Sequence, residues 1–267
     1  MSRTNHRTWQ NHRIGYFLLT VHLDPPSEAG SREKHPKLAD FVRHTIELAD
    51  EHQLPVTWAV SDPAYSAATP LVLRSATCHE LAILGDANWV GPTAGRTRFA
   101  RELARRVSQA RSARINVTTL VPRVGSIDRH IDLVIKQRIS AIAGVKEASS
   151  ANRPMALPRA RHYGVWEIPV SGSLPLRSHW WFCGKRFVLR QIRTAAHAAA
   201  VFHLVVDAPA MVQEGRGATA TLAWFVRRVA ELRDRGLIGV ETLGETAARL
   251  SAVPSATPQH SILRRAA

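Results

Sequence analysis

Cysteine is scarce in this chain, and its two cysteines, Cys78 and Cys183, lie far apart in the sequence. No Cys-x-x-Cys pair occurs, which argues against a cysteine-based zinc site, and free thiols suit a reducing compartment. Long apolar runs are also missing. The first run, residues 14–23, is too short to span a bilayer, and no small-residue cleavage site follows it. We therefore expect a cytoplasmic protein without a membrane span.

Lysine is nearly absent, with five residues, so arginine supplies most of the formal net charge of +15. Such a charge favours an anionic partner such as nucleic acid, an acidic glycan or anionic lipid. Arginine-rich, lysine-poor chains also arise from base composition alone. Aromatic residues make up 6% and do not alternate with the arginines, which argues against nucleic acid as a partner.

Glycine-rich phosphate loops are missing too, so a nucleotide-binding sheet loses support. What the chain does contain is a long alternation of strand-like and helix-like segments. This order predicts an α/β protein in which helices cover a parallel sheet, either as a closed barrel or as an open doubly wound sheet. We expect strands near residues 14–23, 54–60, 80–84, 116–121, 139–143, 164–170, 201–206 and 237–241, and helices near 36–52, 96–113, 126–138, 187–200, 218–235 and 243–250.

The two ends of the chain lack an apolar period. Residues 1–13 are polar and basic, which predicts a disordered tail, and residues 251–267 contain two prolines and predict a flexible tail. Residues 14–250 are expected to form one barrel domain.

Ionisable side chains occur at several expected strand ends, where parallel α/β proteins carry their chemistry. His22 and Asp24 follow the first strand, Glu80 and Asp86 bracket the third, and His203 lies within the strand that Asp207 ends. Each also has a structural interpretation: an Asp can cap a turn, and a buried His can simply be hydrogen-bonded. The arginines on one face of the helix at 96–113 are expected to be solvated.

The stretch from Cys78 to Trp89 resembles the metal-binding segment of the polysaccharide deacetylase-like (NodB homology) family, and four further segments resemble that family in the same order. The five segments are Leu19-Thr20-Val21-His22-Leu23-Asp24-Pro25-Pro26, the helix with Leu54-Pro55-Val56-Thr57-Trp58-Ala59-Val60, His79-Glu80-Leu81-Ala82, Val121-Pro122-Arg123-Val124-Gly125-Ser126, and Phe202-His203-Leu204 with the closing helix and strand. The resemblance covers roughly residues 14–250. It implies a distorted (β/α) barrel of the polysaccharide deacetylase/glycoside hydrolase type.

In that family an aspartate and a His-x-x-x-His pair hold a divalent metal, which activates water to remove an acetyl group. Here the two histidine positions fall on Leu84 and Asn88, which are not zinc ligands. Depending on the register, the paired aspartates become His22-Leu23 or Leu23-Asp24. The late histidine survives as His203, and the arginine of the family's Arg-Pro-Pro-Tyr segment as Arg123.

The resemblance therefore predicts His22, Asp24, Arg123 and His203 as the catalytic residues. It also predicts a pocket lined by His79, Glu80, Asp86, Asn88 and Trp89. We expect no cofactor; zinc is expected only if the site is rearranged, with Asp24 and His203 as its ligands.

Three hypotheses remain open. The first is a divergent, carbohydrate-related member of this fold that lacks metal-dependent deacetylase activity. The second is an active hydrolase of amide or ester bonds in acetylated sugars with a rearranged site, and the third is a non-enzymatic binder of an anionic partner. A carbohydrate is the expected ligand under the first two.

Overall fold

The computed structural model describes residues 14–24, 36–125, 127–144, 157–175 and 181–252. The tail expected at 1–13 and most of that expected at 251–267 lie outside these residues. The strands are β1 Gly15–His22, β2 Thr57–Val60, β3 Glu80–Gly85, β4 Thr119–Pro122, β5 Ala141–Ala143, β6 Arg159–Ala160, β7 Trp166–Ile168, β8 Gly172–Leu174, β9 Val201–Asp207 and β10 Ile238–Val240. The helices are α1 Pro36–Glu51, α2 Thr69–Leu73, α3 Ala87–Val90, α4 Arg96–Ser112, α5 Ile131–Lys136, α6 Trp181–His197, α7 Ala208–Glu214, α8 Arg216–Asp234 and α9 Leu243–Ala252.

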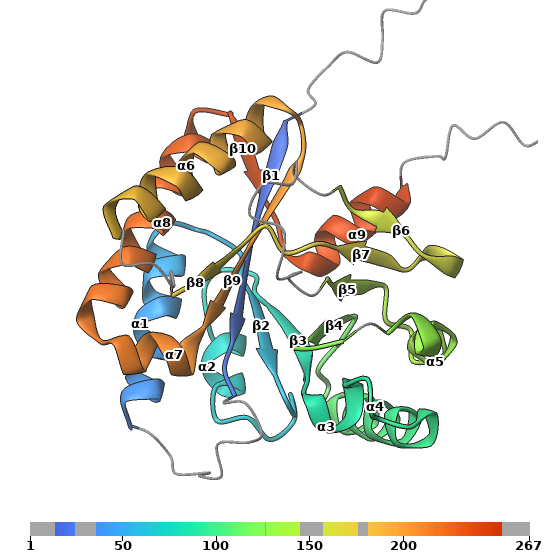
Figure 1. Ribbon diagram of the computed structural model, residues 1–267. Helices are drawn as coiled ribbons and strands as arrows, with labels where there is room; N and C mark the ends of the chain where they lie inside the picture. The colour runs from blue at the N-terminus through green and yellow to red at the C-terminus, as the bar shows by residue number, and fades with distance from the viewer. Residues whose placement is uncertain (1–13, 25–35, 126, 145–156, 176–180, 253–267) are drawn as a thin grey trace, which may run out of the picture.

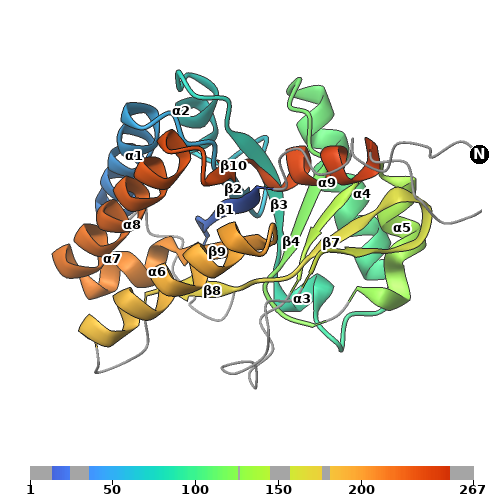
Figure 2. The same ribbon diagram turned by 90° about the horizontal axis from the view of Figure 1, so that it is seen from above.

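The strands form one curled sheet with helices around it (Figures 1 and 2). Its order is β6-β7-β5-β4-β3-β2-β1-β9-β8, and β10 pairs with the first residues of β1. Every pair is parallel except β6 with β7. The curled, mainly parallel sheet confirms the predicted distorted (β/α) barrel. None of the described helices combines the length and apolarity needed to cross a membrane.

The central strand β1 shows how the two faces of the sheet differ. Phe17, Leu19 and Val21 belong to the large core between the sheet and the outer helices. Because successive side chains of a strand point to opposite faces, Leu18, Thr20 and His22 point to the other, concave face. That face holds a second apolar cluster: Leu18, Ala59, Ala82, Leu84, Val121, Ala141, Ala143, Ile168 and Val201, with Leu243 and Ala247 of α9. Helix α9 thus packs inside the curl of the sheet, against β5 and β7.

Most long elements lie where the sequence predicts them, but α6 begins at Trp181 instead of residue 187, and the helix expected at 126–138 is the shorter α5. Several short elements were missed. The helix expected at 96–113 is α4, and the strand expected at 201–206 is β9 with one more residue. The sequence did not predict α2, α3, α7, β6 or β8, because one or two turns, or two or three strand residues, show no periodicity. Helix α9 extends to Ala252, beyond the expected domain boundary at residue 250.

Candidate functional site

Polar side chains gather at the carboxyl ends of neighbouring strands. His22 ends β1, Ser61 follows β2, Asp86 follows β3, Arg123 follows β4, and Asp207 ends β9. These strands are parallel, so all five residues lie at the same edge of the sheet, which we call the rim. Of the residues that the sequence singles out, His22, Asp24, Asp86 and Arg123 lie at or just after these strand ends, on this side of the molecule.

Arg123 makes hydrogen bonds to several of the strand ends that form the rim. Its Nη1 donates to Asp207 Oδ2 over 2.9 Å, and its Nη2 donates to the backbone carbonyl of Asp24. Its own backbone amide donates to the Gly85 carbonyl over 2.8 Å, which anchors the end of β4 to β3. The guanidinium is mostly buried, and its Nε finds no hydrogen-bond partner among the described residues. Arg123 therefore joins strands β1, β3, β4 and β9.

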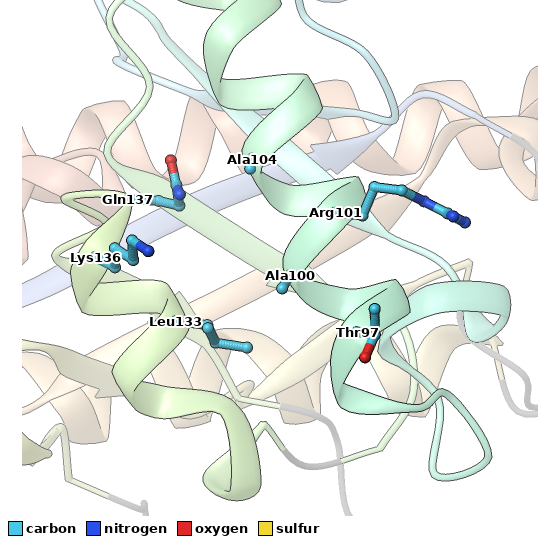
Figure 3. A pocket seen from close by; sticks show the side chains of 7 residues that line it. All are labelled: Thr97, Ala100, Arg101, Ala104, Leu133, Lys136 and Gln137. Carbon is cyan, nitrogen blue, oxygen red and sulfur yellow. The ribbon is translucent and has the colours of Figure 1, made fainter.

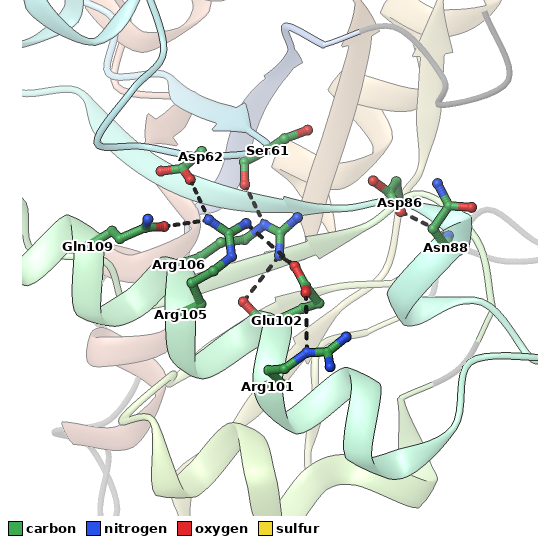
Figure 4. Close-up of polar contacts among 9 residues, drawn as sticks. All are labelled: Ser61, Asp62, Asp86, Asn88, Arg101, Glu102, Arg105, Arg106 and Gln109. Atoms are coloured by element: carbon green, nitrogen blue, oxygen red, sulfur yellow. Dashed lines mark hydrogen bonds and ion pairs between the residues drawn. The ribbon is translucent and has the colours of Figure 1, made fainter. Parts of the chain in front are cut away.

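Asp24 extends this network to β2 and α4. Its Oδ2 accepts a hydrogen bond from the Ser61 amide, and the Ser61 carbonyl accepts one of 2.7 Å from Arg106 Nε (Figure 4). Arg106 is buried and its guanidinium lies 4.6 Å from the ring centre of Trp89. The expectation that the arginines of this helix are solvated is therefore wrong for Arg106, because its side chain lies under the loop after β2.

His22 lies just inside the rim with an unsatisfied ring nitrogen. Its side chain is buried, and its Nε2 forms no hydrogen bond among the described residues. Burial lowers the pKa of His22 to about 3, and electrostatic repulsion from Arg123 and, at low pH, from protonated His203 acts in the same direction. The imidazole is therefore neutral at pH 7.

His203 lies deeper, in the middle of β9. It pairs with Leu18 in the parallel register, is fully buried, and its Nε2 lies 2.8 Å from Thr20 Oγ1. Burial lowers the pKa of His203 to about 4, while the backbone carbonyls of Ile168 and Pro169 raise it. His203 therefore lies below the rim, in contact with Thr20 of β1, and is not accessible to solvent.

The residues after β3 form the short helix α3. Asp86 caps it, with Oδ1 accepting from the Asn88 amide over 2.8 Å (Figure 4). Asn88 is exposed at the rim, whereas Trp89 is buried against Phe99 and Arg106. Trp89 is thus a core residue, and its expected place in a pocket lining is wrong.

The expectation that His79 and Glu80 share this rim is also wrong. Both lie at the start of β3, which in a parallel sheet is the opposite end from the rim. His79 Nδ1 accepts from the Val56 amide over 3.2 Å, and burial lowers its pKa. The sequence could not separate the two ends, because Glu80 and Asp86 are only a short strand apart along the chain.

Glu80 holds the start of α9 against the sheet. Its carboxylate accepts hydrogen bonds from the hydroxyls of Thr57 and Thr119 and, over 3.0 Å, from the Gly244 amide. A Cβ at Gly244 would lie 2.7 Å from Glu80 Oε1, so a larger residue here would displace the Glu80 carboxylate. Burial raises the pKa of Glu80, and these hydrogen bonds oppose that shift.

Comparison with solved structures identifies the fold. No family profile and no curated protein matches the chain. A crystal structure assigned as a polysaccharide deacetylase from Mycobacterium smegmatis matches with a TM-score of 0.68 and 16% identity over 92% of this chain and 93% of its own. The fold is that of the polysaccharide deacetylases. A 4-alpha-glucanotransferase from Thermococcus litoralis also matches, with a TM-score of 0.59 and 12% identity over 88% of this chain and 40% of its own.

In this polysaccharide deacetylase fold, the positions expected to hold the metal do not fit zinc. Leu84 is 1% exposed and packs in the concave apolar cluster, next to Val121 in register. Asn88 is exposed on α3. The described residues contain no group of three or more His, Cys, Asp or Glu side chains placed to hold a metal ion. A leucine side chain offers no donor atom, so position 84 cannot supply a ligand to zinc.

Two residues of this rim network, Ser61 and Arg106, were missed, and so was the pairing of Asp207 with Arg123. Asp207 had a recognisable signal, since an Asp between a strand and Ala208-Pro209 is typical of a helix cap, and its Oδ1 does accept from the Ala210 amide over 3.1 Å. Its pairing with Arg123 joins residues 84 positions apart. No local pattern carries such a contact.

Proposed function

We propose that the chain binds a neutral carbohydrate at the rim and does not use the deacetylase metal. The observation that carries this proposal is the pair of buried, unpartnered nitrogens, His22 Nε2 and Arg123 Nε, at the ends of β1 and β4. Buried polar atoms are nearly always hydrogen-bonded, so these two call for a polar group that enters from the rim.

The charges at the rim favour a neutral ligand over an anion. The Arg123 guanidinium is paired with the Asp207 carboxylate, and His22 is uncharged at pH 7 because its pKa is about 3. No free cation remains among these groups, and Asp24 adds a negative charge. A sugar hydroxyl both donates and accepts, so it can satisfy the Arg123 Nε–H and either tautomer of His22. The structurally similar proteins described as a polysaccharide deacetylase and a glucanotransferase support a carbohydrate as the class.

Hydrolysis is less well supported than binding. A general base works best when its pKa lies near the working pH, and a histidine with a pKa of about 3 is a weak base at neutral pH. His203 is enclosed, and the donor set for a water-activating metal is missing at Leu84 and Asn88. The alternative, a hydrolase of amide or ester bonds in acetylated sugars, needs a base that this cluster does not supply.

The first test is binding of neutral oligosaccharides, such as oligomers of glucose and N-acetylglucosamine, measured by calorimetry and NMR. We expect binding that weakens about tenfold or more in His22→Phe, which keeps an aromatic ring and removes the nitrogens. His44→Gln, exposed on α1, is the control and should bind normally. If uronic acid oligomers bind more tightly than neutral ones, or if His22→Phe binds normally, the proposal fails.

The second test addresses the metal and the chemistry. Purified protein should not retain zinc or cobalt at one equivalent. Tight retention that is lost in Asp24→Asn or His203→Gln would overturn the metal-free part of the proposal. Turnover of acetylated sugars above the background rate would replace binding by the hydrolase alternative.

A further inference from the structure

A groove of about 360 Å³ lies on the outside of the barrel, between α4 and α5. Ala100, Ala104 and Leu133 line it with apolar surface, while Arg101 stands on the α4 side and Lys136 on the α5 side. Figure 3 shows Leu133 extending towards α4 and the Arg101 guanidinium projecting outwards from its helix. The groove is separate from the rim, which is built by strand ends.

Two polar contacts hold the helices on either side of this groove. The Arg96 side chain pairs with Asp132 near the start of both helices, and Arg111 Nη2 donates to the Gln137 carbonyl over 3.0 Å near their ends. Both arginines are exposed, so each contact is weak by itself. Together they bridge α4 and α5 at both ends of the groove, so its walls are in place before any ligand arrives.

The α4 side of the groove carries surplus positive charge. The helix contains six arginines and one acidic residue, Glu102. That single carboxylate is shared by Arg106 at 2.6 Å, Arg105 at 3.4 Å and Arg101 at 3.7 Å (Figure 4). Arg101 is the most distant of the three and its side chain is 71% exposed. Its charge is therefore the least compensated.

The α5 side adds to this surplus. Lys136 and Arg138 are exposed, and neither forms an ion pair in the described part of the chain. Lys136 stands on the α5 wall, and the Arg101 guanidinium points away from α5 on the outer side of α4 (Figure 3). The two cations flank the apolar floor and produce a local positive potential that the rim, with its paired Arg123, does not have.

We propose that this groove binds an acidic segment of a partner protein, with an aliphatic side chain on the alanine and leucine floor and carboxylates beside Arg101 and Lys136. The apolar floor fits a peptide better than an acidic glycan, which has no aliphatic side chain to place there. No aromatic residue lines the groove, so bases would find no stacking surface. The apolar residues lie recessed between two helices, whereas a membrane surface requires protruding ones.

The test is fluorescence anisotropy with a short labelled peptide that carries one leucine between two runs of glutamate. We expect binding that weakens as salt is raised. The double variant Arg101→Glu with Lys136→Glu should bind about tenfold more weakly or worse. The matched control reverses Arg193 and Arg227, exposed on α6 and α8, and so changes net charge equally. It should lose about threefold at most, because its charges lie away from the groove.

A third variant, Ala104→Leu, fills the groove without changing charge and should weaken binding about fivefold. The proposal is overturned if the control variant loses as much as the groove variant, or if Ala104→Leu binds like the wild type. It is also overturned if an oligonucleotide or vesicles of anionic lipid bind more tightly than the peptide and lose binding in the same groove variant. Circular dichroism and thermal unfolding of each variant check that the fold is retained.

Discussion

At the scale of single residues, burial has changed the acid–base behaviour of the histidines. The pKa of His22 falls from 6.5 to about 3, so the folded chain binds fewer protons than the unfolded chain between these values. The stability that depends on neutral His22 is therefore complete above pH 6.5 and is lost as the pH falls towards 3. His203, with a pKa of about 4, adds a second loss in the same direction.

The first residue-scale prediction concerns this acid sensitivity. Below pH 6.5 the free energy of unfolding should fall by up to about 1.4 kcal/mol per pH unit for each buried histidine. In His22→Asn the free energy of unfolding should depend less steeply on pH, because one of the two buried histidines no longer takes up a proton on unfolding. Urea unfolding between pH 7 and 4.5 measures this slope. His44→Gln is the control, because His44 is exposed and its replacement should leave the slope intact. An unchanged slope in His22→Asn would show that His22 is solvated.

Glu80 should behave in the opposite way. Burial raises the pKa of Glu80 above its ordinary value of 4.5, so the folded chain keeps a proton that the unfolded chain releases. Its contribution to stability is complete below pH 4.5 and declines as the pH rises through the folded pKa.

We therefore predict that Glu80→Gln gains stability relative to the wild type as the pH is raised above 4.5, because a neutral amide carries no ionisation cost. The difference in unfolding free energy between the two proteins, plotted against pH, is the measurement. Glu51→Gln, at an exposed position on α1, should show no such trend. A difference that stays flat with pH would mean that Glu80 ionises as easily as a solvated carboxylate.

At the scale of elements, α9 begins with a capping box that its sequence already displays. Glu245 donates its amide to Thr242 Oγ1 over 3.2 Å, and the Glu245 carboxylate accepts from the Thr242 amide over 2.8 Å. Since α9 fills the concave face with Leu243 and Ala247, a weaker cap should loosen the barrel interior. A capping box formed by residues three positions apart thus helps to hold α9 against the concave face of the sheet.

Thr242→Ala should lower the free energy of unfolding by about 1 kcal/mol, the usual cost of losing such a cap. Thr242→Ser keeps the hydroxyl and serves as the control, with a smaller loss. Hydrogen exchange of the α9 amides should rise in Thr242→Ala and stay near the wild-type rate in Thr242→Ser. Equal exchange in the two variants would assign any lost stability to the missing methyl group.

At the scale of the whole molecule, the net charge of +15 is a source of self-repulsion. Salt screens this repulsion more in the compact state than in the expanded one. Raising the salt concentration from about 20 to 200 mM at pH 7 should therefore raise the melting temperature. Each kcal/mol added to the free energy of unfolding should raise it by about 2–4 °C. The Arg193→Glu, Arg227→Glu variant has less charge and should gain less. A melting temperature that falls with salt would show that attractive pairs such as Arg96–Asp132 dominate.

Much of the architecture could be predicted from the sequence, and so could part of the site. The apolar period of α4 and the continuous apolar run of β9 are local signals. The order of such elements along the chain predicted a helix-covered parallel sheet, and the family resemblance predicted the barrel. Asp86 and Asp207 lie at strand ends as expected. Arg106 was misplaced because its burial depends on the loop that carries Ser61, which is far away in sequence.

The sequence by itself determined the order of strands and helices, the presence of Leu84 and Asn88 where the resemblance expects metal ligands, and the excess of arginine, because each can be seen in composition or in short segments. Only the tertiary structure decided that Glu80 and Asp86 face opposite ends of the barrel and that Arg123 is neutralised by Asp207. It also decided that Arg106 of α4 joins the rim through Ser61 whereas Arg101 borders the groove between α4 and α5. The physical reason is that burial and pairing depend on contacts between distant segments, and these contacts form only when the sheet curls.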